Sequence, residues 1–233
     1  MKNKLISVSF ISYSAIYLLI ILLGLEDITW YMKPFLIPFL LYLVYTFENF
    51  PTKNILLTAL LFSWIAALIF LFTYKGKIYF TFGLIAFLFS HVIYIVLFNK
   101  QLKIKEFKFN SIFIAGIVAI LIYLFILINL LLPGLDTLKI PVILYAIVIS
   151  SMLLFAFKGS LQWQNPANMY VLLGAFIFVC SDSILAINKF YTELPYASFW
   201  IMSTYLVAQF LIVTGILRLN KQKTASPFNE NAV

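Results

Sequence analysis

The sequence predicts an all-α, polytopic membrane protein with about eight transmembrane helices. The chain of 233 residues is 64% hydrophobic and only 10% charged, whereas soluble domains are nearer half apolar and a quarter charged. Its apolar runs are continuous and about 20 residues long, which is the length that crosses the hydrocarbon core as a helix. Strands of a membrane barrel would instead alternate apolar and polar residues.

The apolar runs define a single transmembrane domain over residues 1–219. The second run is short and contains Pro34 and Pro38, so we expect it to be tilted, kinked or extended by its flanks. The polar segment 220–233 is expected to be a disordered cytoplasmic tail. The predicted spans are 5–25, 34–47, 53–73, 77–99, 110–132, 138–157, 167–188 and 194–217.

The charged residues indicate topology rather than a binding surface. The net charge is +8, but the charges gather in the short segments between apolar runs, where they determine orientation. A nucleic-acid partner is therefore not expected. With the N-terminus inside, most of the 16 Lys and Arg residues lie on the inner side. We expect an integral protein of a bacterial inner (plasma) membrane, with both termini in the cytoplasm.

Two pairs of segments indicate a weak parallel internal repeat. "KPFLIPFLLY" at Lys33 is similar to "KIPVILY" at Lys139, and "LLFSWIAAL" is similar to "FIFVCSDSIL". The second pair aligns Asp182 with Ala66 or Ala67. Because four helices separate the members of each pair, the copies would share one orientation in the membrane. Shared apolar composition is the alternative explanation.

A carboxylate, Asp182, lies between Ser181 and Ser183 inside the seventh run. A charged side chain near the bilayer centre costs at least about 2.5–3.5 kcal/mol on insertion scales, so Asp182 must face other helices or a watery cavity. We interpret it as a candidate catalytic acid, because intramembrane ionisable groups are functional by default. The alternative is a structural contact with a serine, a lysine or a backbone carbonyl.

The only histidine, His91, lies well inside the fourth run beside Tyr94. Counting from the span ends places His91 and Asp182 on the order of 10 Å apart along the membrane normal. The two side chains can share a cavity at that separation; a histidine satisfied by one hydrogen bond is the alternative. A lone histidine and the single Cys180 make neither a metal cluster nor an internal disulfide, so no metal site is expected.

Further polar residues lie near the span ends or on one helix face. Lys33 and Lys139 each stand at an outer span end before a proline. Such lysines usually extend to the interface, which we expect of Lys139; for Lys33 the alternative to the interface is contact with a phosphate. Tyr205 and Gln209 are four residues apart and share a face of the last span. Interhelical hydrogen bonds account for both.

Motifs of several other enzyme classes are absent from the sequence. No serine lies in a G-x-S-x-G turn, and the chain has neither an H-E-x-x-H motif nor a Gly-rich phosphate loop. The sequence therefore disfavours three classes of protein: a serine hydrolase, a zinc protease and an ATP-driven pump.

Motifs in five spans resemble those of the YhhN family, the membrane family that includes lysoplasmalogenases. The similarity runs from Lys33 to Gly215 and is most specific around His91 and Asp182. The segments that carry it, in the family's order, are "KPFLIPFL", "ALLFSW", "GLIAFLFSHVIYIVLF", "GAFIFVCSDSILAINKF" and "YLVAQFLIVTG".

The resemblance implies an eight-helix membrane hydrolase of lipid metabolism. Its substrates would be lysoplasmalogens, ether lipids that are cleaved at a vinyl ether bond to a fatty aldehyde and a glycerophospho-base. Opening a vinyl ether requires a protonated acid in a dry site, a second group that orients water, and stabilisation of the cation. No cofactor or metal is needed. The implied catalytic residues are Asp182 and His91, and the implied substrate-binding residues are Lys33, Tyr94, Tyr205 and Gln209.

One position departs from the family pattern. After "LLFSW" the family usually carries Gly-Asp, whereas this chain has alanine at the expected carboxylate position, Ala67. If the reaction requires both carboxylates, the chain is an impaired hydrolase. The alternatives are a lipid-binding or transport protein that has lost the reaction, and a small proton-coupled carrier that uses Asp182 as its proton site. Oligomeric state cannot be predicted from the sequence.

Overall fold

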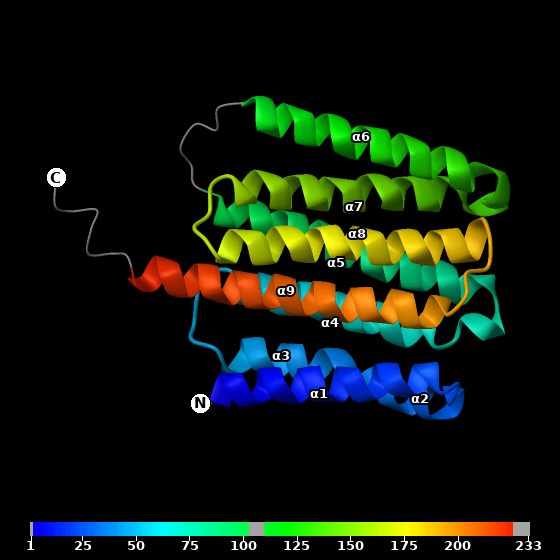
Figure 1. Ribbon diagram of the computed structural model, residues 1–233, viewed down its shortest axis with the longest axis horizontal. Coiled ribbons are helices and arrows are strands. Elements are labelled where there is room, and N and C mark those ends of the chain that lie inside the picture. The colour runs from blue at the N-terminus through cyan, green and yellow to red at the C-terminus, as the bar shows by residue number, and fades with distance from the viewer. Residues whose placement is uncertain (1, 103–109, 226–233) are drawn as a thin grey trace.

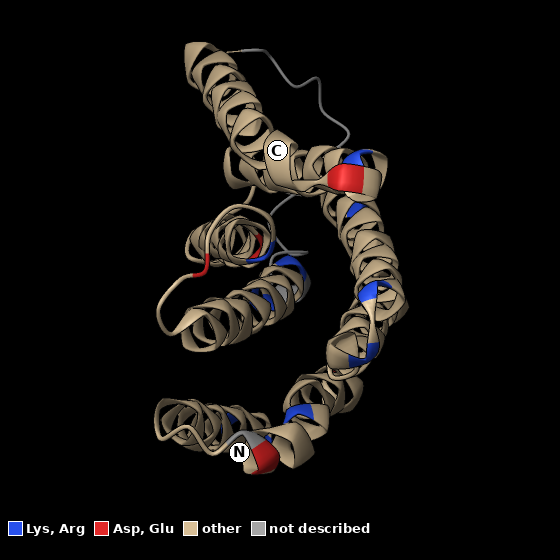
Figure 2. Ribbon diagram, turned by 90° about the vertical axis from the view of Figure 1, so that its right-hand side faces the viewer, with Lys and Arg blue, Asp and Glu red and all other residues tan. Residues whose placement is uncertain are grey.

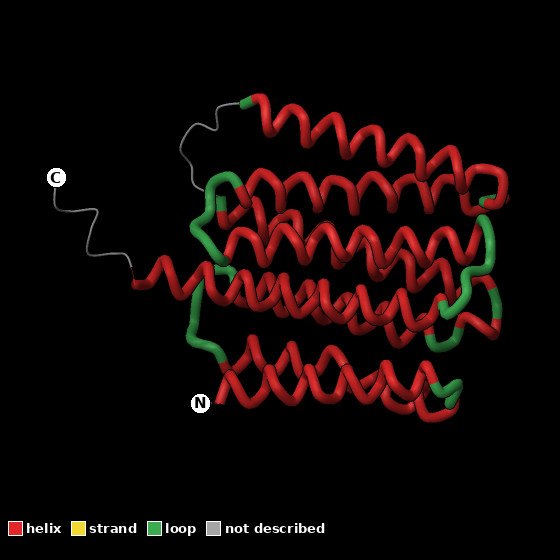
Figure 3. The backbone as a smooth tube through the Cα atoms, viewed as in Figure 1, coloured by secondary structure: helices red, strands yellow, loops and turns green. Residues whose placement is uncertain are grey.

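The computed structural model describes residues 2–102 and 110–225. Within these ranges the chain forms α-helices joined by short loops and 3-10 turns, and no strand is present (Figure 3). The prediction of an all-α fold is confirmed. The helices are α1 (Lys2–Leu22), α2 (Glu26–Met32), α3 (Leu36–Thr46), α4 (Lys53–Phe70), α5 (Lys77–Gln101), α6 (Ser111–Leu131), α7 (Lys139–Ser160), α8 (Ala167–Phe190) and α9 (Ala197–Ala225).

Eight segments of the described chain are long and apolar enough to cross a membrane, which confirms the predicted number of spans. Seven of them are single helices, some extended by a 3-10 turn. The second span, Asp27–Thr46, is composite. It consists of most of α2, a 3-10 turn at Lys33–Phe35 and α3. The short second run therefore reaches membrane length through its N-terminal flank, as expected.

Two neighbouring helices complete the hydrogen bonding at the break in the second span. A continuous helix would bond the Pro34 carbonyl to the N–H of residue 38, but Pro38 has no N–H. Trp64 of α4 donates its Nε1–H to the Pro34 carbonyl instead, at 2.7 Å. Tyr13 of α1 similarly donates to the Met32 carbonyl at 3.1 Å. A broken helix is tolerated in a membrane because its freed carbonyls find partners in this way.

The helices form an open arc with the pair α8 and α9 on its concave side (Figures 1 and 2). Along the arc the order is α6, α7, α5, α4, α3 and α1, and each helix packs against the next. The closest pairs are α4 with α5 and α8 with α9. These pairs are the third and fourth spans and the seventh and eighth spans, so they occupy corresponding positions in the two halves of the chain. The internal repeat itself stays a prediction.

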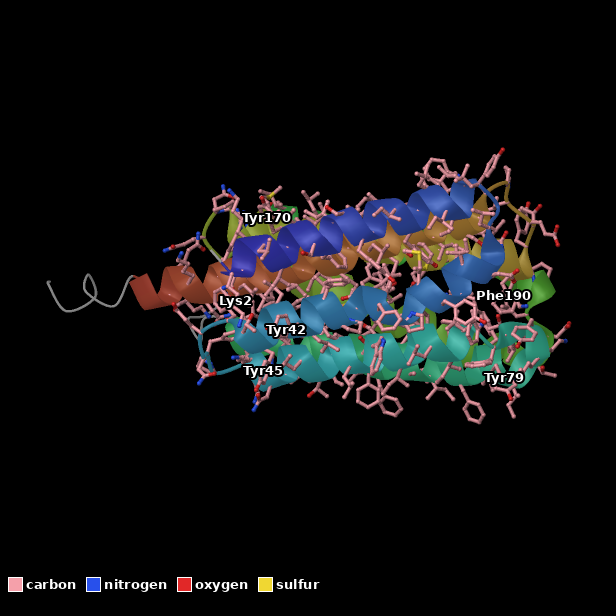
Figure 4. The ribbon with its side chains drawn as sticks, turned by 90° about the horizontal axis from the view of Figure 1, so that it is seen from below. Lys2, Tyr42, Tyr45, Tyr79, Tyr170 and Phe190 are labelled. Carbon is pink, nitrogen blue, oxygen red and sulfur yellow. The ribbon has the colours of Figure 1, made fainter. Side chains whose placement is uncertain are left out.

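The start of α1 and the end of α9 lie at one end of the bundle (Figure 1). At this end the Lys2 ammonium of α1 lies 5.5 Å above the ring of Tyr42 on α3, whereas Tyr79 and Phe190 mark the opposite end (Figure 4). The last helix differs from the prediction, because α9 continues to Ala225 beyond the expected boundary at residue 219. Lys223 donates to Gln101 Oε1 at 2.6 Å, which ties this extension to α5. Residues 226–233 of the predicted tail lie outside the described ranges.

Candidate active site

A cavity of about 780 Å³ opens at the end of the bundle away from the chain termini. Its wall is built from the ends of α1, α4, α5 and α8 that lie at this end of the bundle, the break in the second span, and the start of α9. The volume falls within the range of roughly 300–1,000 Å³ that is typical of small-molecule sites. Of the residues that the sequence singles out, the cavity is lined by Lys33, Ala67, Asp182 and Tyr205.

Asp182 of α8 presents one carboxyl oxygen to this cavity and the other to the protein. Oδ2 accepts a short hydrogen bond from the Tyr145 hydroxyl of α7 and lies 3.2 Å from His91 Nε2 of α5. Oδ1 has no hydrogen-bond partner in the described part of the chain. Because Oδ1 is also not buried, it is open to the cavity that Asp182 lines. The Asp182 side chain is 9% exposed.

His91 lies behind Asp182 and does not line the cavity. Its side chain is fully buried, and Nε2 is 2.8 Å from the Tyr145 hydroxyl oxygen. Because that hydroxyl donates to Asp182, its oxygen accepts from His91, which assigns the proton to Nε2. Nδ1 is buried without a partner in the described residues, as the unprotonated nitrogen of this tautomer would be. Phe178 packs edge-on against the imidazole at 4.8 Å.

The contact between His91 and Asp182 corrects the separation of about 10 Å along the membrane normal that span counting predicts. Side chains on a helix lean toward its N-terminus. The N-terminus of α5 lies at the cavity end and that of α8 lies at the opposite end, so these two side chains lean toward each other. Counting Cα positions ignores this inclination as well as helix stagger.

Sequence reasoning missed Tyr145, the residue that connects the other two. It is one of 14 tyrosines, and tyrosines in membrane spans are usually read as interfacial or packing residues. Nothing in the adjacent sequence distinguishes Tyr145 from the others. Only the packing of α7 against both α5 and α8 shows that its hydroxyl group meets His91 and Asp182.

Tyr94 and Gln209 lie outside the cavity, although the sequence analysis assigned them to substrate binding. The Tyr94 hydroxyl donates to Gln209 Oε1 at 2.7 Å, and Gln209 Nε2 donates to Ser63 Oγ at 2.9 Å. Ser63 in turn bonds Ser90 at 2.7 Å. This buried chain joins α4, α5 and α9, so the predicted interhelical hydrogen bonding of Gln209 is confirmed.

Two polar residues of the cavity wall differ in what they offer a ligand. The Tyr205 hydroxyl is buried near Gln209 and Ser63 and makes no hydrogen bond of good geometry within the described residues. The Lys33 ammonium has neither a hydrogen bond nor an ion pair there. Lys139, by contrast, is exposed and does not line the cavity.

The site thus combines an acid that has one open oxygen with a cation that is unpaired among the described residues. The other oxygen of the acid accepts from Tyr145 and lies beside His91 Nε2. Aromatic rings of Phe87 and Tyr205 line the wall and pack edge to face at 5.7 Å, and ring faces of this kind attract positive charge. Among the described residues, no group of three or more His, Cys, Asp or Glu side chains could hold a metal ion.

Comparison with known proteins identifies related sequences. The YhhN family matches residues 28–216, which confirms the resemblance drawn from the motifs. Lysoplasmalogenase TMEM86B of Mus musculus is 38% identical over 84 residues, covering 36% of this chain and 34% of that protein. Lysoplasmalogenase TMEM86B of Homo sapiens is 37% identical over 86 residues, with the same two coverages. The chain thus matches about a third of the length of these curated relatives. No solved structure matches it.

Proposed function

Because the chain belongs to the YhhN family, we propose that it is a membrane hydrolase that cleaves the vinyl ether bond of lysoplasmalogens. The observation that carries this proposal is the open Oδ1 of Asp182 in a cavity that also holds the unpaired Lys33. The matched relatives are named lysoplasmalogenases, which supports the same chemistry. The products are a fatty aldehyde and a glycerophospho-base.

The first step transfers a proton from Asp182 to carbon. Oδ1 of the neutral acid protonates the β-carbon of the vinyl ether, the alkene electrons form the new C–H bond, and an oxocarbenium ion results. Asp182 becomes a carboxylate beside the cation and stabilises it by charge. The ring of Phe87 on the cavity wall contributes further attraction.

Water then completes the reaction. Its oxygen attacks the carbon of the oxocarbenium ion, and Asp182 takes the proton that the water loses, which restores the acid. The resulting hemiacetal collapses: its hydroxyl proton is lost, the glycerol oxygen leaves as an alcohol after gaining a proton, and the aldehyde carbonyl forms. One water is consumed, and no proton is gained or lost overall.

Lys33 supports a phosphate-bearing substrate. An ammonium on a cavity wall without a protein counter-ion favours an anionic ligand. A second cation on the wall, Lys189, lies two turns from Asp182 on α8, which is about 10 Å along the helix axis. The substrate phosphate would bind these lysines while the vinyl ether reaches Asp182.

The orientation in the membrane is part of the proposal. The described chain ends lie together (Figure 1), and the positive-inside rule predicts that they lie in the cytoplasm of a bacterial cell. The cavity then opens toward the outer face of the inner membrane. Reporter enzymes fused at the C-terminus, active either in the cytoplasm or outside it, measure this directly; activity of the external reporter would refute the orientation.

The decisive experiment measures fatty-aldehyde release from a lysoplasmalogen by the purified protein. We expect release by the unchanged chain and a loss of about 100-fold or more in Asp182→Asn, the scale of general acid–base catalysis. The matched substrate control is the saturated ether lipid, which has no alkene to protonate and should not react. Absence of aldehyde from a folded protein that retains lipid, detected by mass spectrometry, would instead support a lipid-binding function.

A further inference from the structure

We propose that Tyr145 is a positioning residue for this reaction, and that it binds Oδ2 of Asp182 so that Oδ1 carries the reacting proton. The inference rests on the proposed function. Its geometric basis is that the Tyr145 hydroxyl donates to Oδ2 and accepts from His91 Nε2 at 2.8 Å. In the described residues, both hydrogen bonds to the carboxyl group reach the same oxygen.

This arrangement serves both protonation states of Asp182. When Oδ1 holds the proton, Oδ2 is the carbonyl oxygen of the acid and still accepts from Tyr145. When Oδ1 has given its proton away, the carboxylate keeps the same donors, and hydrogen bonds to an ionised acceptor are about twice as strong as neutral ones. No side chain has to turn between the two steps, so the site is preorganised.

His91 acts through Tyr145 rather than on the substrate. The imidazole is fully buried and absent from the cavity wall, so in this proposal it is not the group that orients the attacking water. Nε2 lies within hydrogen-bond distance of both Tyr145 and Asp182. His91 therefore fixes the direction of the Tyr145 hydroxyl and adds a donor to Oδ2.

In the proposed reaction, the same arrangement allows turnover without the carboxylate that the resemblance implies for the third span. Ala67 lines the cavity but cannot take a proton from water. Asp182 must then give a proton to carbon and accept one from water at the same oxygen. Donors held on Oδ2 stabilise the carboxylate during the interval between these steps. A single carboxylate thus suffices for both proton transfers.

A matched pair of tyrosine substitutions tests the role in catalysis. Tyr145→Phe removes the hydroxyl that binds Asp182. Tyr123→Phe removes a hydroxyl on α6 that bonds Ser183 at 2.7 Å, one residue away from Asp182. We expect Tyr145→Phe to lower kcat about 10–100-fold, the scale of losing positioning, with KM within about twofold. Tyr123→Phe should keep kcat within about threefold. Equal kcat values in the two variants would overturn the proposal.

A spectroscopic measurement decides the contact without any turnover. His91 is the only histidine, so protein labelled with ¹⁵N-histidine gives one pair of imidazole signals. We expect the chemical shift of Nε2 to be that of a protonated nitrogen in the unchanged chain. This shift should change in Tyr145→Phe and stay the same in Tyr123→Phe. An unchanged Nε2 signal in Tyr145→Phe overturns the proposal. If neither the unchanged chain nor any variant releases aldehyde, but the Nε2 signal still moves in Tyr145→Phe, the proposed function is contradicted and the contact between Tyr145 and His91 is not.

A second substitution covers the case in which Tyr145→Phe does not fold. Replacing Tyr145 by 3-fluorotyrosine keeps the ring and the hydroxyl but makes that hydroxyl a stronger donor and a weaker acceptor. We expect the His91 Nε2 signal to move, because its acceptor is the altered oxygen. A signal at the position of the unchanged chain would show that Tyr145 and His91 are not coupled, and would overturn the inference.

Discussion

Ala67 of α4 and Asp182 of α8 line the same cavity, although 115 residues separate them in the sequence. Ala67 is 6% exposed, whereas its neighbour Ala66 is fully buried and does not reach the cavity. The position at which the resemblance to the YhhN family implies a second carboxylate is therefore part of the cavity wall in this chain. Under the proposed function, a carboxylate at this position would face the substrate together with Asp182.

Restoring that carboxylate should accelerate the reaction. We expect Ala67→Asp to raise kcat for aldehyde release about 10-fold or more, because a second base can take the proton from water while Asp182 gives its own to carbon. The isosteric control is Ala67→Asn, which fills the same space without a charge and should not accelerate release. A rate in Ala67→Asp no higher than in Ala67→Asn would show that a second carboxylate at this position does not assist the reaction.

Removing the Lys33 ammonium should weaken substrate binding more than chemistry. In Lys33→Met, which keeps the apolar stem, we expect KM to rise about 10-fold with kcat changed less, the pattern of lost uniform binding. Lys139→Met is the matched control, since Lys139 is also followed closely by a proline, Pro141, but lies at the start of α7 outside the cavity. A vinyl ether substrate without phosphate should be insensitive to both changes. Equal KM values in the two variants would contradict the assignment.

The contact between Trp64 and Pro34 should contribute to stability because Pro38 lacks an N–H. Trp64→Phe removes the 2.7 Å hydrogen bond to the Pro34 carbonyl, and we expect a loss of about 1 kcal/mol, measured by thermal unfolding in detergent. Pro38→Ala restores the backbone donor that a helix would supply. The loss caused by Trp64→Phe should therefore be smaller in the Pro38→Ala background, as a double-mutant cycle would show. Additive losses would mean that Trp64 acts by packing alone.

The buried chain of polar side chains should act on stability rather than on substrate binding. Gln209→Leu leaves the Tyr94 hydroxyl without its partner, whereas Ser63 keeps its hydrogen bond to Ser90; an unsatisfied buried group costs about 1–3 kcal/mol. The double variant Tyr94→Phe, Gln209→Leu removes the unsatisfied hydroxyl and should lose less than the sum of the single variants. KM should stay within about threefold. A large rise in KM would show that Gln209 contributes to substrate binding after all.

Several features of the fold follow from local sequence alone. Runs of about 20 apolar residues must be helical in a bilayer, because only a helix satisfies every backbone donor and acceptor within one segment. That constraint sets the number of spans and their approximate ends. Pro34 and Pro38 likewise predict the break in the second span, since proline removes a backbone donor. The end of α9 was misplaced because polar residues after Leu219 remain helical, with Lys223 bonded to Gln101.

By itself, the sequence determined the class of protein, its spans and the two residues, His91 and Asp182, whose burial in apolar surroundings required an explanation. Only the tertiary structure decided which side chains meet them. Tyr145 joins the site because α7 packs against both α5 and α8, whereas Tyr94 and Gln209 turn to each other behind the cavity. The physical reason is that local sequence sets burial and helicity, while contacts between distant side chains depend on helix stagger and on the direction in which each side chain leans.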